Sequence, residues 1–161
     1  MIKIITENPA ETISFGARLG RLLKPGAVVA LCGELGSGKT TLVKGIAQGL
    51  GIDEARVLSP SFVLIRELRG KKMPLFHADF YRLENAKQLI GLGLDEYSFG
   101  KGVFVMEWAQ KAEQFLPEDY ILIKISSRSK EKREFRIYLK SRNDKYPALA
   151  DKIEKFKEQF R

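Results

Sequence analysis

Cysteine is almost absent from this chain, and long apolar runs and low-complexity segments are missing altogether. The single cysteine, Cys32, excludes a disulfide within the chain and is typical of proteins kept in a reducing cytoplasm. No apolar run approaches the roughly 20 residues that a membrane-spanning helix needs, so we expect a cytoplasmic protein without a membrane segment. Residues 1–11 lack a charged region, an apolar region and a small-residue cleavage site, so we expect no export.

The bulk composition is that of an ordinary globular domain. The chain has 161 residues, 44% of them hydrophobic and 30% charged, and these values argue against a disordered chain. A chain of this length buries enough surface to need neither disulfides nor a structural metal. We therefore expect one domain that spans residues 1–161.

Charge is the unusual feature of the composition. The net charge is +8, yet residues 1–123 hold 15 basic and 14 acidic side chains, whereas residues 124–161 hold 13 basic and 6 acidic ones. The positive excess therefore belongs to a basic C-terminal segment, 124–161. Such a segment is either a docking face for phosphates or a solubilising surface, and composition alone does not separate the two.

Hydrophobic patterning predicts that strands and helices alternate along the chain. Asn8 followed by Pro9 is a typical helix start, and apolar residues then recur with helical spacing up to Lys24. Continuous apolar runs at 27–31 and 103–106 are typical of strands buried on both faces of a sheet. The remaining expected elements are strands at 2–5, 61–68, 73–79, 120–125 and 135–139 and helices at 40–50, 84–92 and 146–160.

The order of these elements predicts the fold class. In the expected strands 120–125 and 135–139, apolar and polar residues alternate, which favours half-solvated antiparallel strands near a sheet edge. Helices interleaved with buried strands indicate an α/β protein. We expect a three-layer sandwich with a mixed, largely parallel sheet and antiparallel edge strands.

A glycine-rich loop between a buried strand and a helix predicts a phosphate-binding site. Backbone N–H groups of such a P-loop and the positive end of the following helix bind phosphate oxygens. Lys39 is expected to reach the β- and γ-phosphates of a nucleotide, and the Thr40 hydroxyl to bind Mg²⁺. The loop matches the motif G-x-x-x-x-G-K-[ST] completely, through Gly33, Glu34, Leu35, Gly36, Ser37, Gly38, Lys39 and Thr40.

Two acidic residues at strand ends are candidates to complete the magnesium site. Glu107 follows the apolar run 103–106, and Asp79 follows residues 75–78. Because ligands in open α/β sheets gather at the carboxyl ends of the strands, both side chains are expected near the nucleotide. The alternative for each is a strand-end acid that simply faces water. With Lys39, these two acids are the candidate catalytic residues.

The sequence favours ATP over GTP. Guanine-specific proteins carry an N-K-x-D motif, which residues 143–145 do not satisfy, and no D-x-x-G motif follows the loop at a strand end. A small-molecule kinase usually has an arginine-bearing lid over the phosphates, and no single basic segment of this sequence has the pattern of such a lid. An ATPase switch needs only the loop, metal-binding carboxylates and segments that sense the γ-phosphate.

Four sequence blocks carry a family resemblance. They are GELGSGKTTL at 33–42, SPSF at 59–62, HADFYRL at 77–83 and EW at 107–108. In this order and spacing they closely resemble the TsaE (YjeE) family, the bacterial ATPase component of tRNA threonylcarbamoyladenosine synthesis. The loop alone is shared by very many proteins, but the combination is highly specific.

The resemblance implies a P-loop ATPase that is weak alone and works in complex with the proteins TsaD and TsaB. TsaD transfers the threonylcarbamoyl group to a tRNA adenosine next to the anticodon, so tRNA would be met through the complex. The resemblance also implies Mg²⁺ ligation by Thr40 and Glu107, with Asp79 near the metal and the γ-phosphate, and a second switch-like segment at 59–62. The implied nucleotide contacts are the P-loop residues already named together with Thr41, Asp79, Trp108 and, by a loose alignment, Arg133.

The hypothesis that the sequence favours is an ATP-driven switch with Mg²⁺ as cofactor. Two alternatives stay open: a small-molecule kinase, and an RNA-binding module that uses the basic C-terminal segment. That segment has neither an RNP-like aromatic motif nor a GxxG clamp.

Overall fold

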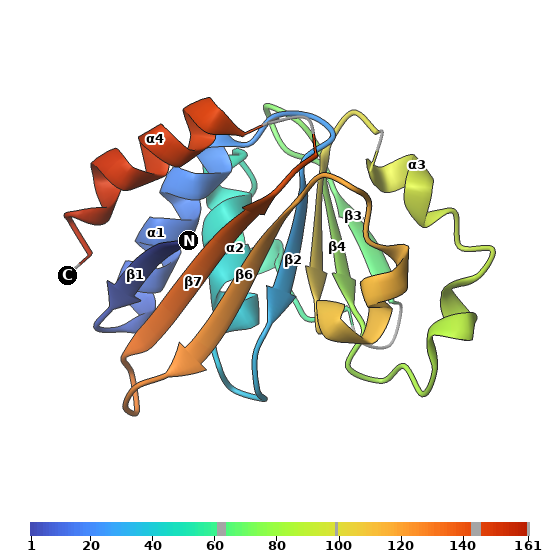
Figure 1. The fold of residues 1–161 in the computed structure, drawn as a ribbon, viewed down its shortest axis with the longest axis horizontal. Helices are drawn as coiled ribbons and strands as arrows, with labels where there is room; N and C mark the ends of the chain where they lie inside the picture. Colours follow the sequence, from blue (N-terminus) through green and yellow to red (C-terminus); the bar gives the residue numbers. More distant parts are fainter. Residues whose placement is uncertain (61–63, 99, 143–145, 161) are drawn as a thin grey trace.

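A seven-stranded sheet in the order β1-β7-β6-β2-β5-β4-β3 runs through the molecule (Figure 1). The structure is a computed structural model, and it describes residues 1–60, 64–98, 100–142 and 146–160. Apolar clusters lie on both faces of the sheet, so the fold is the expected α/β sandwich. The strands are β1 (Ile2–Thr6), β2 (Val28–Cys32), β3 (Ile65–Leu68), β4 (Leu75–Asp79), β5 (Val103–Glu107), β6 (Tyr120–Ser127) and β7 (Arg133–Lys140).

The sheet is parallel in its centre and antiparallel at both edges, as predicted. Strands β6, β2, β5 and β4 are parallel neighbours. At one edge β3 pairs antiparallel with β4, and at the other β7 pairs antiparallel with β6 and then with β1. The predicted strand at 61–68 is confirmed over β3, whereas residues 61–63 lie outside the described residues.

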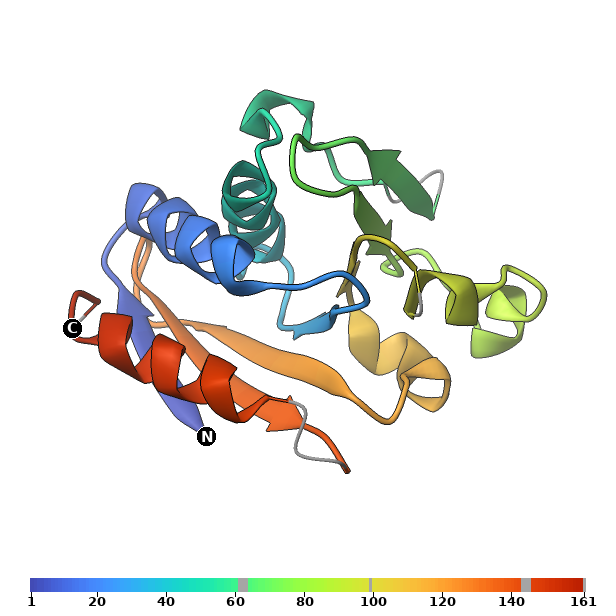
Figure 2. The same ribbon diagram turned by 90° about the horizontal axis from the view of Figure 1, so that it is seen from above.

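Helices and 3-10 turns connect the strands and cover much of the sheet (Figure 2). None of the helices that the structure describes is long and apolar enough to cross a membrane. The helices are α1 (Pro9–Leu22), α2 (Lys39–Gly49), α3 (Leu94–Ser98) and α4 (Pro147–Lys157), and the 3-10 turns are η1 (Glu54–Arg56), η2 (Ala86–Leu89) and η3 (Ala109–Phe115).

Local sequence signals located α1 correctly but not the short helical segments on either side of β5. The Asn8 side chain caps α1 by accepting a hydrogen bond from the Glu11 N–H at 2.9 Å. The helix predicted over 84–92 is only the turn η2, because the backbone is already extended at Ile90 and Gly91 follows with a φ of 85°. The helix α3 and the turn η3 are too short to show helical periodicity, so the sequence pattern did not indicate them.

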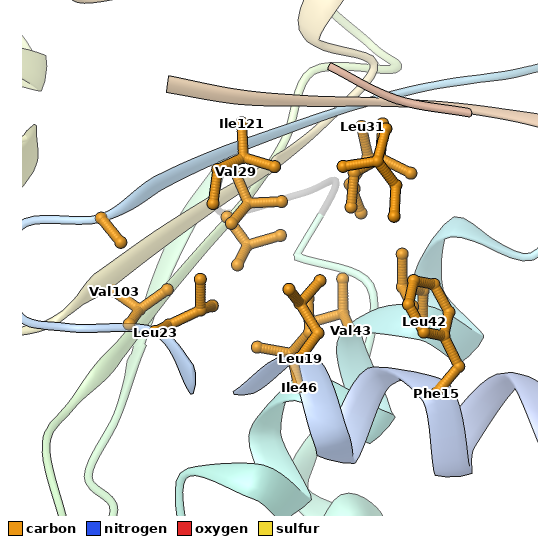
Figure 3. Close-up of a cluster of buried hydrophobic side chains, with 14 of the residues drawn as sticks. Phe15, Leu19, Leu23, Val29, Leu31, Leu42, Val43, Ile46, Val103 and Ile121 are labelled. Atoms are coloured by element: carbon orange, nitrogen blue, oxygen red, sulfur yellow. The ribbon is translucent and has the colours of Figure 1, made fainter. Parts of the chain in front are cut away.

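The larger apolar core lies between the sheet and helices α1, α2 and α4. Figure 3 shows Phe15 and Leu19 of α1 and Ile46 of α2 on the helix side of this cluster, with Val29 and Leu31 of β2 on the sheet side. A second cluster fills the opposite face and contains alternate residues of the same strands. The strand β2 is therefore buried on both faces, as its continuous apolar run predicts.

Helices α1 and α2 cross where both carry glycine. A Cβ atom added to Gly45 would lie 2.3 Å from the backbone oxygen of Ile13 and 2.8 Å from the Cα atom of Gly16. One turn further on, a Cβ atom on Gly49 would lie 2.4 Å from the Ala17 oxygen. The two backbones thus touch without intervening side chains. Since the phosphate-loop motif ends on the first turn of α2, this contact helps to place the loop.

We predict that Gly45→Ala destabilises the protein even though alanine is the better helix former. Backbone atoms must move to admit the methyl group, and overpacking of this kind typically costs about 1–3 kcal/mol. Urea denaturation should show the loss in the free energy of unfolding. The matched control is Gln48→Ala, an exposed position on the same helix, which should change stability by less than about 0.5 kcal/mol. Equal stability of the two variants would contradict the packing argument.

Candidate functional site

The carboxyl ends of β2, β4 and β5 meet at one edge of the sheet, and a cleft of about 420 Å³ opens there. Asp79 and Glu107, the last residues of β4 and β5, are register partners and both line it. Both acids thus lie at strand ends beside the loop, as their positions in the sequence predict. The cleft is lined by Leu35, Gly36, Gly38, Lys39, Thr40, Thr41, Ser59, Asp79, Tyr81, Arg82, Glu107 and Trp108.

The loop that connects β2 to α2 needs glycine at two of its positions. Gly36 and Gly38 have φ angles of 74° and 100°, a region that side chains with a Cβ atom avoid. Gly38 is also the N-cap of α2. The first N–H groups of a helix have no acceptor within it, and they carry the positive end of the helix dipole. The arrangement can therefore bind an anion such as a phosphate group.

Lys39 is folded back onto its own loop. Its Nζ atom donates hydrogen bonds to the backbone oxygens of Gly33 at 2.7 Å and Glu34 at 2.8 Å, and it lies 4.2 Å from the centre of the Trp108 ring. Burial lowers the pKa of Lys39, and the neighbouring Glu107 carboxylate opposes that change. A phosphate in the cleft could bind Nζ only in exchange for some of these partners.

The Glu107 carboxylate is buried at the floor of the cleft and fully engaged by two donors. The Thr40 hydroxyl donates to its two oxygens, at 2.8 Å and 3.0 Å. On the other side the Nε2 atom of His77, a completely buried residue of β4, lies 2.8 Å from Oε1 and donates to it. His77, the first residue of the HADFYRL block, therefore supports the Glu107 carboxylate.

Asp79 joins two chain segments. Its carboxylate accepts a hydrogen bond from the Ser59 hydroxyl at 2.5 Å and another from the Tyr81 backbone N–H at 2.9 Å. The segment 59–62, expected to be switch-like, thus reaches the cleft through Ser59, while Ser61 and Phe62 lie outside the described residues. Any ligand that changes the contacts of Asp79 would act on both segments.

Trp108 has an unusual backbone conformation, with a φ of 56°. For a bulky residue this left-handed conformation is strained, and strain of this kind clusters at functional sites. The ring lies 5.0 Å from that of Tyr81, centre to centre. Lys111 braces the pair by donating hydrogen bonds to the backbone oxygens of Tyr81 and Leu83. Lys111 belongs to none of the sequence motifs, so no local pattern indicates its role.

The other predicted site residues lie around the loop rather than in the cleft. Gly33 and Glu34 hold Lys39 from behind through their carbonyl groups, and Ser37 lies 3.3 Å from its Nζ atom. Arg133, from the start of β7, donates a hydrogen bond to the Gly36 oxygen at 3.2 Å. The structure thus brings every predicted site residue to the loop or to the cleft beside it.

The cleft offers a few oxygen ligands for a metal ion rather than a complete set of protein ligands. Within the described ranges, no group of three or more His, Cys, Asp or Glu side chains has the geometry to hold a metal ion. Thr40 and Glu107 supply a hydroxyl and a carboxylate in contact, with Asp79 alongside. Such a set suits a cation that takes its remaining ligands from water and phosphate oxygens, as Mg²⁺ does.

Comparison with known proteins decides the family. A family model described as threonylcarbamoyl adenosine biosynthesis protein TsaE matches residues 6–135, a range that includes the loop, both acids and Arg133. The chain belongs to the TsaE family. The resemblance seen in the four sequence blocks is thereby confirmed.

Individual TsaE relatives match over most of the chain. A tRNA threonylcarbamoyladenosine biosynthesis protein TsaE from Bacillus subtilis is 40% identical and covers 94% of this chain and 93% of its own length. The protein of the same name from Treponema pallidum is 38% identical, over 77% and 90% respectively. The crystal structure of Bacillus subtilis YdiB superposes with a TM-score of 0.80 at 36% identity and covers 96% of this chain and 94% of its own.

We predict that His77→Leu lowers the free energy of unfolding by about 1–3 kcal/mol, because the buried Glu107 carboxylate then loses a donor. The change keeps a side chain of similar size, so packing is largely preserved. In His77→Gln the amide can donate from nearly the same place and should restore much of the loss. Chemical denaturation measures both variants, and a glutamine variant no more stable than the leucine one would argue against the hydrogen bond as the cause.

Proposed function

We propose that this TsaE-family chain is a Mg²⁺-dependent ATPase that acts as a switch in threonylcarbamoyladenosine synthesis on tRNA, together with TsaD and TsaB. The pathway is supported by the relatives, which are described as tRNA threonylcarbamoyladenosine biosynthesis proteins. The observation that carries the ATPase proposal is the contact of Thr40 with Glu107 at the start of α2, directly beside Lys39.

The residues of the cleft fit a bound Mg²⁺. The Thr40 hydroxyl and the Glu107 carboxylate, 2.8 Å apart, would exchange their mutual hydrogen bond for contacts with the ion. Asp79 is the third candidate ligand. When bound, Mg²⁺ neutralises negative charge on the phosphate oxygens.

The chain's own groups would bind ATP and stabilise the charge that moves during hydrolysis. The loop N–H groups hold the phosphates, and Lys39 reaches the β- and γ-phosphates. A water oxygen then bonds to the γ-phosphorus while the bond to the β–γ bridging oxygen breaks, which yields ADP and phosphate. Asp79 is the candidate to orient this water. Arg82 also lines the cleft and is the candidate for additional charge stabilisation.

The contacts of Asp79 suggest how hydrolysis would change the conformation of the neighbouring segments. Its carboxylate is bonded to Ser59 and to the Tyr81 backbone, and Tyr81 packs on Trp108 under Lys111. Departure of the γ-phosphate would change the balance of charge at Asp79 and release or tighten both segments. We propose that TsaD and TsaB contact this cluster and complete a site that is slow alone.

We predict that Lys39→Ala and Glu107→Gln each lower the rate of ATP hydrolysis by about a hundredfold or more. The first removes a cation that stabilises transition-state charge, and the second removes a candidate ligand of the Mg²⁺ that does the same. Phosphate release from the purified chain, with and without purified TsaD and TsaB, measures the rate. The matched control is Lys44→Ala on the same helix α2, outside the cleft, which should leave the rate unchanged.

The same assay separates the proposal from a kinase. With γ-labelled ATP, an ATPase releases the label as free phosphate, whereas a kinase transfers it to a metabolite. Label transferred without free phosphate would overturn the proposal, and so would a rate that TsaD and TsaB leave unchanged.

We further predict that nucleotide binding changes the fluorescence of Trp108. The chain contains one tryptophan, so the signal has a single source. Lys39 Nζ lies 4.2 Å from its ring centre and would move toward the phosphates. Titration with ADP or ATP in the presence of Mg²⁺ should therefore shift the emission in a saturable way. In Lys39→Ala the unliganded protein should already show altered emission and a much smaller response, and a full wild-type response in that variant would contradict the predicted movement.

A further inference from the structure

The half of the sheet formed by β1, β7 and β6 is covered by the described helices on one side only. Ile4 of β1, Phe135 of β7 and Ile123 of β6 point into the core with α1 and α4. The alternate residues of the same strands point the other way, and Lys3, Lys124, Arg136 and Lys140 are exposed there. In Figure 1 none of the helices that the structure describes lies in front of β6 and β7. This solvent-exposed surface of β1, β7 and β6 is called the outer face below.

Three cations stand side by side across the outer face. The strand registers pair Lys3 with Arg136 and Arg136 with Lys124, so one basic residue from each of β1, β7 and β6 lies in a single row. Neighbouring strands are about 5 Å apart, and like charges directly opposite each other destabilise a sheet. A buried acid, Glu134, pairs with Lys3 and Arg136 and offsets part of this repulsion. The positive charge that remains along the row suits a polyanionic ligand.

A buried glutamate holds part of this charge in place. Glu134 has no exposed surface, and it accepts hydrogen bonds from Arg136 at 2.8 Å and Arg128 at 2.9 Å and pairs with Lys3 at 3.0 Å. Burial alone would raise the pKa of Glu134, but these partners outweigh it and lower the pKa to about 2. The cationic side chains remain about half exposed, at 46% to 50%. They are thus ordered before any ligand arrives, which reduces the entropy lost on binding.

An aromatic ring lies within the charged surface. Tyr138, two residues after Arg136 on β7, is flanked by Lys124 and Lys140, whose Nζ atoms lie 5.8 Å and 5.9 Å from the ring centre. Among the described residues that β1, β6 and β7 direct to this face, Glu134 is the one acid. On RNA-binding surfaces, basic groups contact phosphates while an aromatic ring beside them stacks on a base.

We propose that the outer face binds the phosphate backbone of tRNA through Lys3, Lys124, Arg128, Arg136 and Lys140, with Tyr138 available for stacking. The choice of tRNA rests on the proposed function. The face begins at the β6–β7 hairpin, whose Arg133 contacts the P-loop at Gly36, so RNA and nucleotide would meet the same hairpin from two sides. The basic C-terminal segment is therefore not one surface: β7 contributes to this face, whereas Lys152 and Lys155 lie on α4.

The test uses the full chain, an unmodified tRNA transcript with a fluorescent label, and anisotropy at several salt concentrations. Lys124→Glu/Lys140→Glu reverses two charges that Glu134 does not bind, and it should weaken binding at least about tenfold and flatten the slope of log affinity against log salt by about 1 to 2. The matched control, Lys152→Glu/Lys155→Glu on exposed positions of α4, makes the same change in net charge and should stay within about twofold of wild type.

Several outcomes would overturn this proposal without touching the ATPase. They are no tRNA binding by wild type at low salt, equal losses in the two double variants, and a Lys124→Glu/Lys140→Glu variant that binds tRNA normally but no longer captures TsaD or TsaB. ATP hydrolysis by the isolated chain should be the same in both variants, because neither alters the cleft. A defect in hydrolysis with Lys39→Ala alongside normal tRNA binding would separate the two proposals from each other.

Discussion

The buried carboxylate of Glu107 is the group on which the candidate site depends. A carboxylate out of contact with water must be matched by donors, or its burial costs several kcal/mol. Here the donors come from two other elements: Thr40 at the start of α2 and His77 within β4. Satisfying one charge therefore holds a helix and two strands in a single arrangement. The same arrangement leaves a hydroxyl and a carboxylate where a divalent cation could replace their mutual hydrogen bond.

The rest of the site follows from how α2 is held. Its N-terminus carries the loop, and its far side touches α1 through glycines with no room for a side chain. A helix packed backbone to backbone has little freedom to slide, so the N–H groups at its start keep their place at the cleft. Mobility is left to side chains instead. Lys39 hydrogen-bonds to carbonyls of its own loop, and Asp79 to two segments that lead away from the site.

Charge is organised differently on the two halves of the sheet. At the cleft, acids and a lysine balance one another inside a partly buried site, whereas on the outer face cations are aligned across three strands around one buried acid. The first arrangement suits a small, highly charged ligand with a metal ion. The second suits an extended polyanion, because its charges are spread along a surface rather than focused in a pocket.

Local sequence determined most of the strands, the first helix and the positions of the candidate site residues along the chain. The loop motif, the cap at Asn8, the buried strand runs and the strand-end positions of Asp79 and Glu107 all follow from spacing within a few residues, and so they could be predicted. Tertiary structure alone decided what those residues touch. The partnership of His77 with Glu107, the support of Tyr81 by Lys111, the glycine crossing of α1 and α2, and the row formed by Lys3, Arg136 and Lys124 all join residues far apart in the chain. No local sequence pattern indicates such contacts. Strand order and helix packing create them, and both are set by the burial of the whole core.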